Sequence, residues 1–162
     1  AVSPFSDMRE SKASVIGQRK IRDSVSNELV VQGNAADMVD GAIHASLKAR
    51  GIQSRNAAAW DLSETSIKAE GADILVGGEI KALWVEVISE PLSVNYKAVV
   101  QLRVSTAGVK DGKVLRTLNL STSQERKDVV YSDYTVQEVL VAALSSAIDQ
   151  LLNDEEFKKT IH

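Results

Sequence analysis

Between residues 94 and 105 the chain alternates regularly between apolar and polar side chains. A period of two is typical of a β-strand that buries one face and exposes the other. The segment Lys110–Lys113 follows and predicts a hairpin turn, because Gly112 can adopt the positive φ angle that such a turn needs. A return strand is expected over Val114–Gln124, so the chain contains a long antiparallel hairpin. The apolar members of the first strand are Val94, Tyr96, Ala98, Val100, Leu102 and Val104.

In a second long apolar segment, Asp73–Ile88, the apolar residues switch from one face of the expected strand to the other near the middle. Two sets of residues lie on opposite faces of the expected strand: Ile74, Val76, Gly78 and Ile80 on one, and Leu83, Val85 and Val87 on the other. The change near Ala82 predicts either a β-bulge or a strand that is buried on both faces. Gly77 and Gly78 lie in this segment, and we expect them to mark a bulge or a close backbone approach.

Two segments carry the spacing of amphipathic helices. The first is predicted over Ala35–Arg50, with Asn34 as its N-cap and Gly51 as its end. Gly41 within it is expected to allow close packing on a sheet. The second is expected to open at Thr135, with Glu138 in the capping-box position. Its apolar stripe runs for about four turns and is followed by a charged, solvent-facing end at residues 154–159.

The remaining segments give weaker patterns. Ala1–Phe5 is short and apolar and predicts an edge strand. Ser6–Gly33 is predicted to be a long solvated loop with short strands near Ser14–Ile16 and Glu28–Val31, and an unrecognised hairpin is the alternative. A strand is expected over Ile52–Trp60 and a short helix over Ser63–Glu70.

These elements predict an α+β fold, a two-layer sandwich with a mostly antiparallel sheet and two amphipathic helices on one face. The length of 162 residues is that of one domain, so we expect a single unit over 1–162, less regular over 1–33 and with its core in 34–162. Aromatic residues are only 4% of the chain, and therefore the core must be largely aliphatic. Trp60, Trp84 and Tyr96 are expected to fill space within it.

The composition excludes several classes of function. The chain has no cysteine and two histidines, which rules out disulfides, thiolate sites and a histidine-rich metal site. Its net charge of −3 argues against a dedicated nucleic-acid-binding protein. No segment is apolar for long enough to form a transmembrane helix. Residue 1 is Ala inside a strand-like pattern, so we expect that a targeting segment has been removed from this chain.

Few residues suggest chemistry, and each has a structural interpretation that we favour. His44, one helical turn from Asp40, could act as a general base, but the same spacing gives an ordinary surface ion pair. The acidic run at residues 154–156 lacks the loop spacing of a calcium site. Basic residues between Arg9 and Arg22 could contact anionic lipid or polysaccharide, although acidic residues lie among them. The sequence therefore predicts no catalytic, cofactor-binding or metal-binding residues and no enzymatic activity.

Three stretches of the chain carry recognisable motifs. VSPFSDMRESKASVIGQRK contains a strand, an Asp-x-Arg start at Asp7 and Arg9, and an Ile-Gly-x-Arg element at Gly17 and Arg19. AADMVDGAIHASLKARGIQ is a helix that ends in glycine. YKAVVQLRVSTAGVKDGKVLRTLNLSTS and TVQEVLVAALSSAIDQLLNDEEF form a hairpin and a closing helix. Together they resemble YajG-type bacterial lipoproteins over nearly the whole chain.

This resemblance implies a periplasmic domain on the outer membrane of a Gram-negative-type bacterium, held by a lipid on an N-terminal cysteine that this chain lacks. It implies no activity and no catalytic residues. We therefore expect a non-enzymatic envelope domain that acts through protein–protein contacts, either with an envelope partner or with itself as a homo-oligomer. An exposed apolar patch on the open sheet face, or beside Trp84, would support this.

Two other functions remain open from the sequence. One is a binding module for lipid, glycan or a peptidoglycan fragment, with a pocket between residues 6–33 and the sheet lined by Arg9, Arg19 or Arg22. The other is a hydrolase that uses His44, which we regard as much less favoured.

Overall fold

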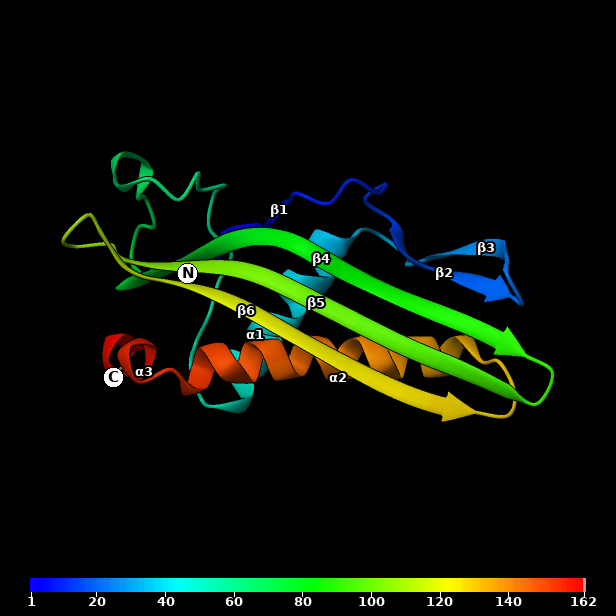
Figure 1. Cartoon of the computed structure of the whole chain (residues 1–162). Coiled ribbons are helices and arrows are strands. Elements are labelled where there is room, and N and C mark those ends of the chain that lie inside the picture. Colours follow the sequence, from blue (N-terminus) through cyan, green and yellow to red (C-terminus); the bar gives the residue numbers. More distant parts are fainter. Residues whose placement is uncertain (162) are drawn as a thin grey trace.

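A computed structural model describes residues 1–161 of the chain. Its centre is a meander of three long antiparallel strands (Figure 1), β4 (Ile74–Glu90), β5 (Ser93–Gly108) and β6 (Lys113–Asp128). Two shorter strands, β2 (Val15–Ile21) and β3 (Ser24–Val30), extend it to give the strand order β3-β2-β4-β5-β6, and short β1 (Ser6–Asp7) also pairs with β4. The predicted hairpin turn is present, with Gly112 at φ +61°. The predicted α+β fold is confirmed.

The change of phase in β4 is a β-bulge. The pairing of β4 with β5 shifts register between Ile80 and Ala82, where the extra residue is Lys81. Ile80 before the bulge and Leu83 after it are both fully buried in the main core. The bulge therefore lets a long strand keep one apolar face toward the helices although its sequence pattern changes phase.

The first thirty residues form more strand than loop, so the prediction of a long solvated loop is wrong and the hairpin alternative is correct. β2 (Val15–Ile21) and β3 (Ser24–Val30) are antiparallel neighbours, with two register shifts between them. β2 also pairs in parallel with β4, from Gly17 opposite Val85 onward. The sequence did not reveal this hairpin because β3 is exposed along most of its length, so its apolar and polar residues do not alternate regularly.

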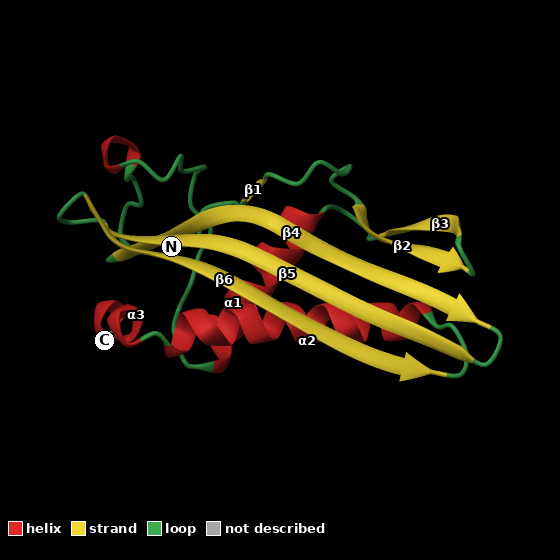
Figure 2. Cartoon of the chain, in the orientation of Figure 1, coloured by secondary structure: helices red, strands yellow, loops and turns green. Residues whose placement is uncertain are grey.

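Three α-helices accompany the sheet (Figure 2): α1 (Ala35–Ala49), α2 (Asp133–Asn153) and α3 (Glu155–Ile161). Asn34 caps α1 as predicted, since its side-chain oxygen accepts a hydrogen bond of 2.8 Å from the backbone N–H of Asp37. The helix α2 begins before the predicted Thr135, which is buried, and its N-cap is Ser132. Glu138 forms no capping box; it pairs with Arg126 on β6.

Four smaller predictions are corrected. The charged end of the chain is not simply solvated, because Phe157 in α3 is buried. Ile52–Trp60 forms no strand and contributes one bridge, from Asn56 to Val2. Between Ser63 and Glu70 the structure has only the 3₁₀ helix η1 (Glu64–Ser66). Gly41 faces open space, so close packing does not explain it.

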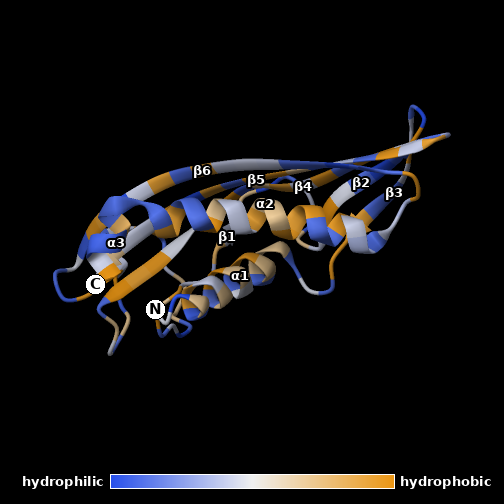
Figure 3. Ribbon diagram, turned by 90° about the horizontal axis from the view of Figure 1, so that it is seen from below, coloured by the Kyte–Doolittle hydropathy of each residue, from blue (hydrophilic) through white to orange (hydrophobic). Residues whose placement is uncertain are grey.

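The core lies between the sheet and the helices, and a smaller apolar cluster covers the other face at one end. In Figure 3 the helices α1 and α2 lie beneath the sheet. Tyr96 belongs to the main core, and Trp60 belongs to the smaller cluster with Leu75 and Ala107. Trp84 is only half-buried, between the inward-facing Leu83 and Val85, so it faces away from the helices and is not a core residue. None of the helices in residues 1–161 has the length and apolar character to cross a membrane.

Candidate functional site

His44 is held by polar side chains of the loop that follows α1. Its Nδ1 lies 2.7 Å from Ser54 Oγ and its Nε2 lies 2.8 Å from Asn56 Oδ1. Asp40 is engaged elsewhere, since its carboxylate accepts a hydrogen bond of 3.2 Å from the backbone N–H of Phe5. Burial is the main reason why the pKa of Asp40 is raised. Both ring nitrogens of His44 thus help to fix the loop, which is a structural role, but the expected surface ion pair with Asp40 is not formed.

Arg9 is a buried structural residue. Its side chain is 4% exposed and forms a bidentate pair with Asp7, with Nε–Oδ1 and Nη2–Oδ2 distances of 2.8 Å. Its Nη1 donates to the carbonyl oxygens of Val15 at 2.8 Å and Leu83 at 3.0 Å. One guanidinium therefore joins the start of β2 to the middle of β4. Arg9 has no free donor face for a ligand.

The Asp7–Arg9 pair should make stability depend on pH. The hydrogen bonds from Arg9 lower the pKa of Asp7 below its ordinary value of 3.8. The pair therefore stabilises the fold above the unfolded-state pKa, and this contribution is lost as pH falls through the lower folded-state pKa. Urea unfolding of the wild type and Asp7→Asn from about pH 7 to about pH 3 should show a stability gap that narrows with acidification. A gap that stays constant with pH would contradict this role for Asp7.

The arginines of residues 9–22 do not converge on a pocket. Arg19 stacks on the ring of Tyr131 at 3.8 Å, and its Nε donates to Ser89 Oγ at 3.0 Å. Burial is the first cause that raises the pKa of Tyr131 to about 12. Arg22 is exposed in the β2–β3 turn at φ +56°. Arg9, Arg19 and Arg22 thus lie in three different surroundings. They do not together line the predicted pocket.

The glycine pair and the acidic run are structural too. A Cβ atom on Gly78 would lie 2.5 Å from the ring of Phe5, and one on Gly77 would lie 2.9 Å from the ring of Trp60, so both mark close approaches. Asp154 pairs with Arg116 at 3.1 Å and accepts a hydrogen bond from the backbone of Phe157. Within residues 1–161 no three acidic, histidine or cysteine side chains gather in a way that could hold a metal ion.

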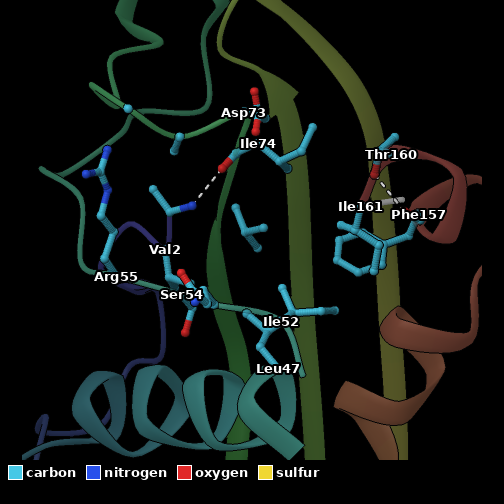
Figure 4. Close-up of a pocket in the computed structure, with 15 residues that line it drawn as sticks. Val2, Leu47, Ile52, Ser54, Arg55, Asp73, Ile74, Phe157, Thr160 and Ile161 are labelled. Carbon is cyan, nitrogen blue, oxygen red and sulfur yellow. Dashed lines mark hydrogen bonds between the residues drawn. The ribbon is translucent and has the colours of Figure 1, made fainter. Parts of the chain in front are cut away.

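A cleft of about 590 Å³ lies where the N-terminus, the loop after α1 and helix α3 meet (Figure 4). This volume is within the usual range for small-molecule sites. Its apolar wall comes from Leu47, Ile52, Ile74, Phe157 and Ile161. Two of its polar groups have partners, since Ser54 contacts His44 and Thr160 donates to the carbonyl oxygen of Phe157. Gln53, Arg55 and Asp73 also line it. With its apolar wall, the cleft has room for an apolar group.

The apolar side chains with the highest exposed fractions gather at the opposite end of the sheet from this cleft, which we call the apolar end. Its members are Leu92 (87% exposed), Val129 (74%), Val130 (71%) and Tyr134 (69%). Leu92 lies in the β4–β5 turn, and the other three lie between the end of β6 and the first turn of α2. These two segments are adjacent because Val94 pairs with Asp128 (Figure 1).

The β2–β3 turn extends the apolar end. Ile21 is opposite Ser89 in the sheet, and the backbone N–H of Arg22 donates to the carbonyl oxygen of Ser89 at 3.2 Å. Ile21 and Val25 add exposed apolar surface there. Acidic residues outnumber basic ones in the three segments 21–25, 89–93 and 127–134. The acids are Asp23, Glu90, Asp128 and Asp133, and the bases are Arg22 and Lys127.

The open face of the sheet is mostly polar, which corrects the expectation of an apolar patch there. Exposed residues such as Gln101, Ser121 and Ser123 alternate with the buried positions of β5 and β6, and Lys97 pairs with Glu125 across them. The apolar end was missed because its residues are far apart in sequence. The signal that could have found it is the pair of apolar side chains, Leu92 and Val129, placed in turns where polar residues are usual.

Comparison with known proteins shows the fold. No family model matches the chain, and no curated protein matches it in sequence. Protein XCC0632 of Xanthomonas campestris, described as DUF330, is 13% identical over 93% of this chain and 79% of its own, with a TM-score of 0.56. PelC of Paraburkholderia phytofirmans, described as a dodecamer, is 14% identical over 93% and 82%, with a TM-score of 0.51.

Lipoprotein GNA1162 of Neisseria meningitidis is more distant. It is 15% identical over 93% of this chain and 100% of its own, with a TM-score of 0.39. At these identities the first two likenesses show a shared fold alone, and the third adds no argument to theirs.

Proposed function

We propose that this chain is a non-enzymatic domain of the bacterial cell envelope that acts through protein–protein contacts. The observation that carries the proposal is the apolar end, where Leu92, Val129, Val130 and Tyr134 are all more than two-thirds exposed. Exposed apolar clusters of this kind mark interaction sites in soluble proteins. The polar side chains of the candidate catalytic positions are used in structural contacts, which supports a binding role over a chemical one.

The charge around the apolar end favours a protein partner over a membrane surface. Peripheral membrane contact usually combines apolar residues with a cluster of lysines and arginines that meets anionic lipids. No such basic cluster lies at this end of the described chain: Arg22 and Lys127 are next to the acids Asp23 and Asp128, and Asp128 also pairs with Arg126. The matching surface on a partner would be an apolar groove.

The proposal also includes a family for the chain and a lipid that holds it to the membrane. The motifs at Asp7, Arg9, Gly17 and Arg19 support placing the chain with YajG-type lipoproteins, on the periplasmic side of the outer membrane and held by an N-terminal lipid. Ala1 bonds to Ile74 at the start of β4, whereas the apolar end lies beyond the last residue of the same strand. The 17 residues of β4 separate the two by on the order of 50 Å. An anchored domain would thus present its apolar end to a distant partner.

Self-association is the second arm of the proposal. PelC, which shares this fold, is described as a dodecamer. A chain of this architecture can therefore assemble with copies of itself, and we propose that the present chain also forms homo-oligomers.

The apolar end can be tested by substitution and photo-crosslinking in intact bacteria. A photoreactive residue at Leu92 should give one discrete protein adduct, whereas a residue at Lys97 on the open sheet face should not. Val130→Asp should weaken this adduct about tenfold or more, because an apolar anchor at an interface contributes at least 1.4 kcal/mol. Val141→Asp, at an exposed position of α2 away from this end, should have no effect. Equal adducts at Leu92 and Lys97 would overturn the proposal.

A second candidate function is the binding of a lipid, for which the cleft of Figure 4 is the specific observation. An alkyl chain would lie against Ile52, Ile74 and Ile161. Native mass spectrometry of the protein with a lysophospholipid should then show a one-to-one complex that Ile52→Asp removes. The same complex in both proteins would assign the binding to another surface.

A further inference from the structure

The outer edge of β6 is a long hydrogen-bonding edge that no strand of the described chain covers. β6 is last in the strand order and is paired only with β5, from Lys113 to Asp128. The stretch Thr117–Gln124 contains no charged residue, no proline and no glycine. Proteins usually protect a free edge with charges, prolines, bulges or short strands. The middle of β6 has none of these protections.

The other edge of the sheet is protected by comparison. β3 has only 7 residues, and its pairing with β2 is interrupted by two register shifts. It also carries Glu28 near its middle. Such an edge is a poor template for a further strand. The two edges therefore differ, and β6 is the one built to accept a partner strand.

We propose that β6 pairs antiparallel with β6 of a second copy of this chain, with a two-fold axis at Thr122. The two sheets would then join into one continuous sheet. This inference specifies the self-association arm of the proposed function and rests on it. It is independent of the partner that the apolar end would contact.

The register follows from the bulge and the charges of β6. Pairing with β5 shifts between Thr106 and Ala107, where Leu115 is the extra residue, so regular pairing on β6 runs from Arg116 to Asp128. An axis at Thr122 uses this whole stretch and places Arg116 opposite Asp128 at both ends. Opposite charges on facing residues stabilise an antiparallel pair.

The neighbouring registers are worse. An axis at Ser121 places Arg116 opposite Arg126, and like charges directly opposite each other destabilise a strand pair. An axis at Ser123 leaves Arg116 with no facing residue on the strand.

The helices allow this arrangement. α2 lies beneath β5 and β6 (Figure 3), and Thr122 Oγ1 donates to the carbonyl oxygen of Ala143 in α2 at 2.6 Å. If each α2 is centred between its own β5 and β6, the two helices lie two strand spacings apart, or about 10 Å. This is the ordinary packing distance of two helices. The second copy would therefore add helix contact to the strand pairing.

Disulfide formation between introduced cysteines tests this register directly, because the chain has no cysteine of its own. With the axis at Thr122, Ser121 of one copy faces Ser123 of the other on the open side of the sheet. Residues that face each other across two antiparallel strands are close enough for a disulfide. The two copies of Ser121 are offset by two positions along the strands and are too far apart for one. A mixture of Ser121→Cys and Ser123→Cys should form a disulfide heterodimer under mild oxidation. Each variant alone should form little covalent dimer.

A charge at the edge provides the matching equilibrium test. Ser121→Asp places an acid of each copy diagonally across the axis on the open face, where like charges repel, and should weaken the dimer in sedimentation experiments. Gln101→Asp, on the same face but on β5, is the control and should leave the dimer unchanged. Circular dichroism spectra of both variants should match the wild type.

The outcomes separate the inference from the proposal on which it rests. The heterodisulfide together with the loss caused by Ser121→Asp would support β6 pairing. An oligomer that forms no such disulfide would overturn the β6 register and leave self-association standing. A wild-type protein that remains monomeric up to high micromolar concentration would overturn both.

Discussion

Gly17→Ala is expected to destabilise the protein by about 3 kcal/mol, the upper range for overpacking a closely fitted site. A Cβ atom at this position would collide with the carbonyl oxygen of Val85. The distance from this Cβ to the carbonyl carbon of Val85 would be only 2.9 Å. Backbone atoms in the middle of a sheet cannot turn aside as a flexible side chain can. The parallel pairing of β2 with β4 must therefore open locally to admit one methyl group.

Gly41→Ala is the matched control for this result. Gly41 lies within α1 and nothing approaches the position of its missing Cβ. The same added methyl group should therefore stabilise the protein by about 0.5 to 1 kcal/mol through helix propensity. Urea unfolding of both variants measures the difference. Equal effects at the two positions would show that β2 and β4 are not in close contact at Gly17.

Arg9→Met is expected to cost about 3 kcal/mol, within the range for removing one partner of a buried ion pair. The methionine would fill much of the space but would leave Asp7 without its counter-ion. The carbonyl oxygens of Val15 and Leu83 would also lose their hydrogen-bond donor. Chemical unfolding would report the loss.

Arg103→Met is the control for Arg9. Arg103 pairs with Glu79 at 3.6 Å, and its side chain is about half exposed. Solvent screens such a pair, so the expected cost is less than about 1 kcal/mol. If the two arginines had similar effects, the buried network around Arg9 would not be the source of its contribution.

The long strands and the helices were predictable from sequence because their patterns are local. Alternation over residues 94–105 and the turn at Gly112 identify the β5–β6 hairpin, and the change of phase after Ile80 identifies the bulge in β4. Asn34 and Gly51 give the limits of α1. In each case neighbouring residues share one periodic environment, so the sequence itself records which face is buried.

The hairpin of β2 and β3, the apolar end and the β6 edge were not predictable in this way. Only Leu29 of β3 is buried, and therefore the sequence of this strand shows no regular alternation. Leu92 and Val130 come together only because the register of β5 and β6 places their turns side by side. Phe157 lies among charged residues with Ile161 four positions later, and such a short pattern does not show that Phe157 reaches the core.

The parallel pairing of β2 with β4 also has a consequence for the order of folding. Gly17 and Val85 are neighbours in the sheet although 67 residues lie between them, whereas β4, β5 and β6 are joined by short turns. Closing a long loop costs more chain entropy than closing a hairpin, so the meander should assemble first and β2 should dock late. Before that step the edge of β4 is bare. A nascent chain would need to keep this edge from pairing with another molecule until its own first thirty residues had returned to cover it.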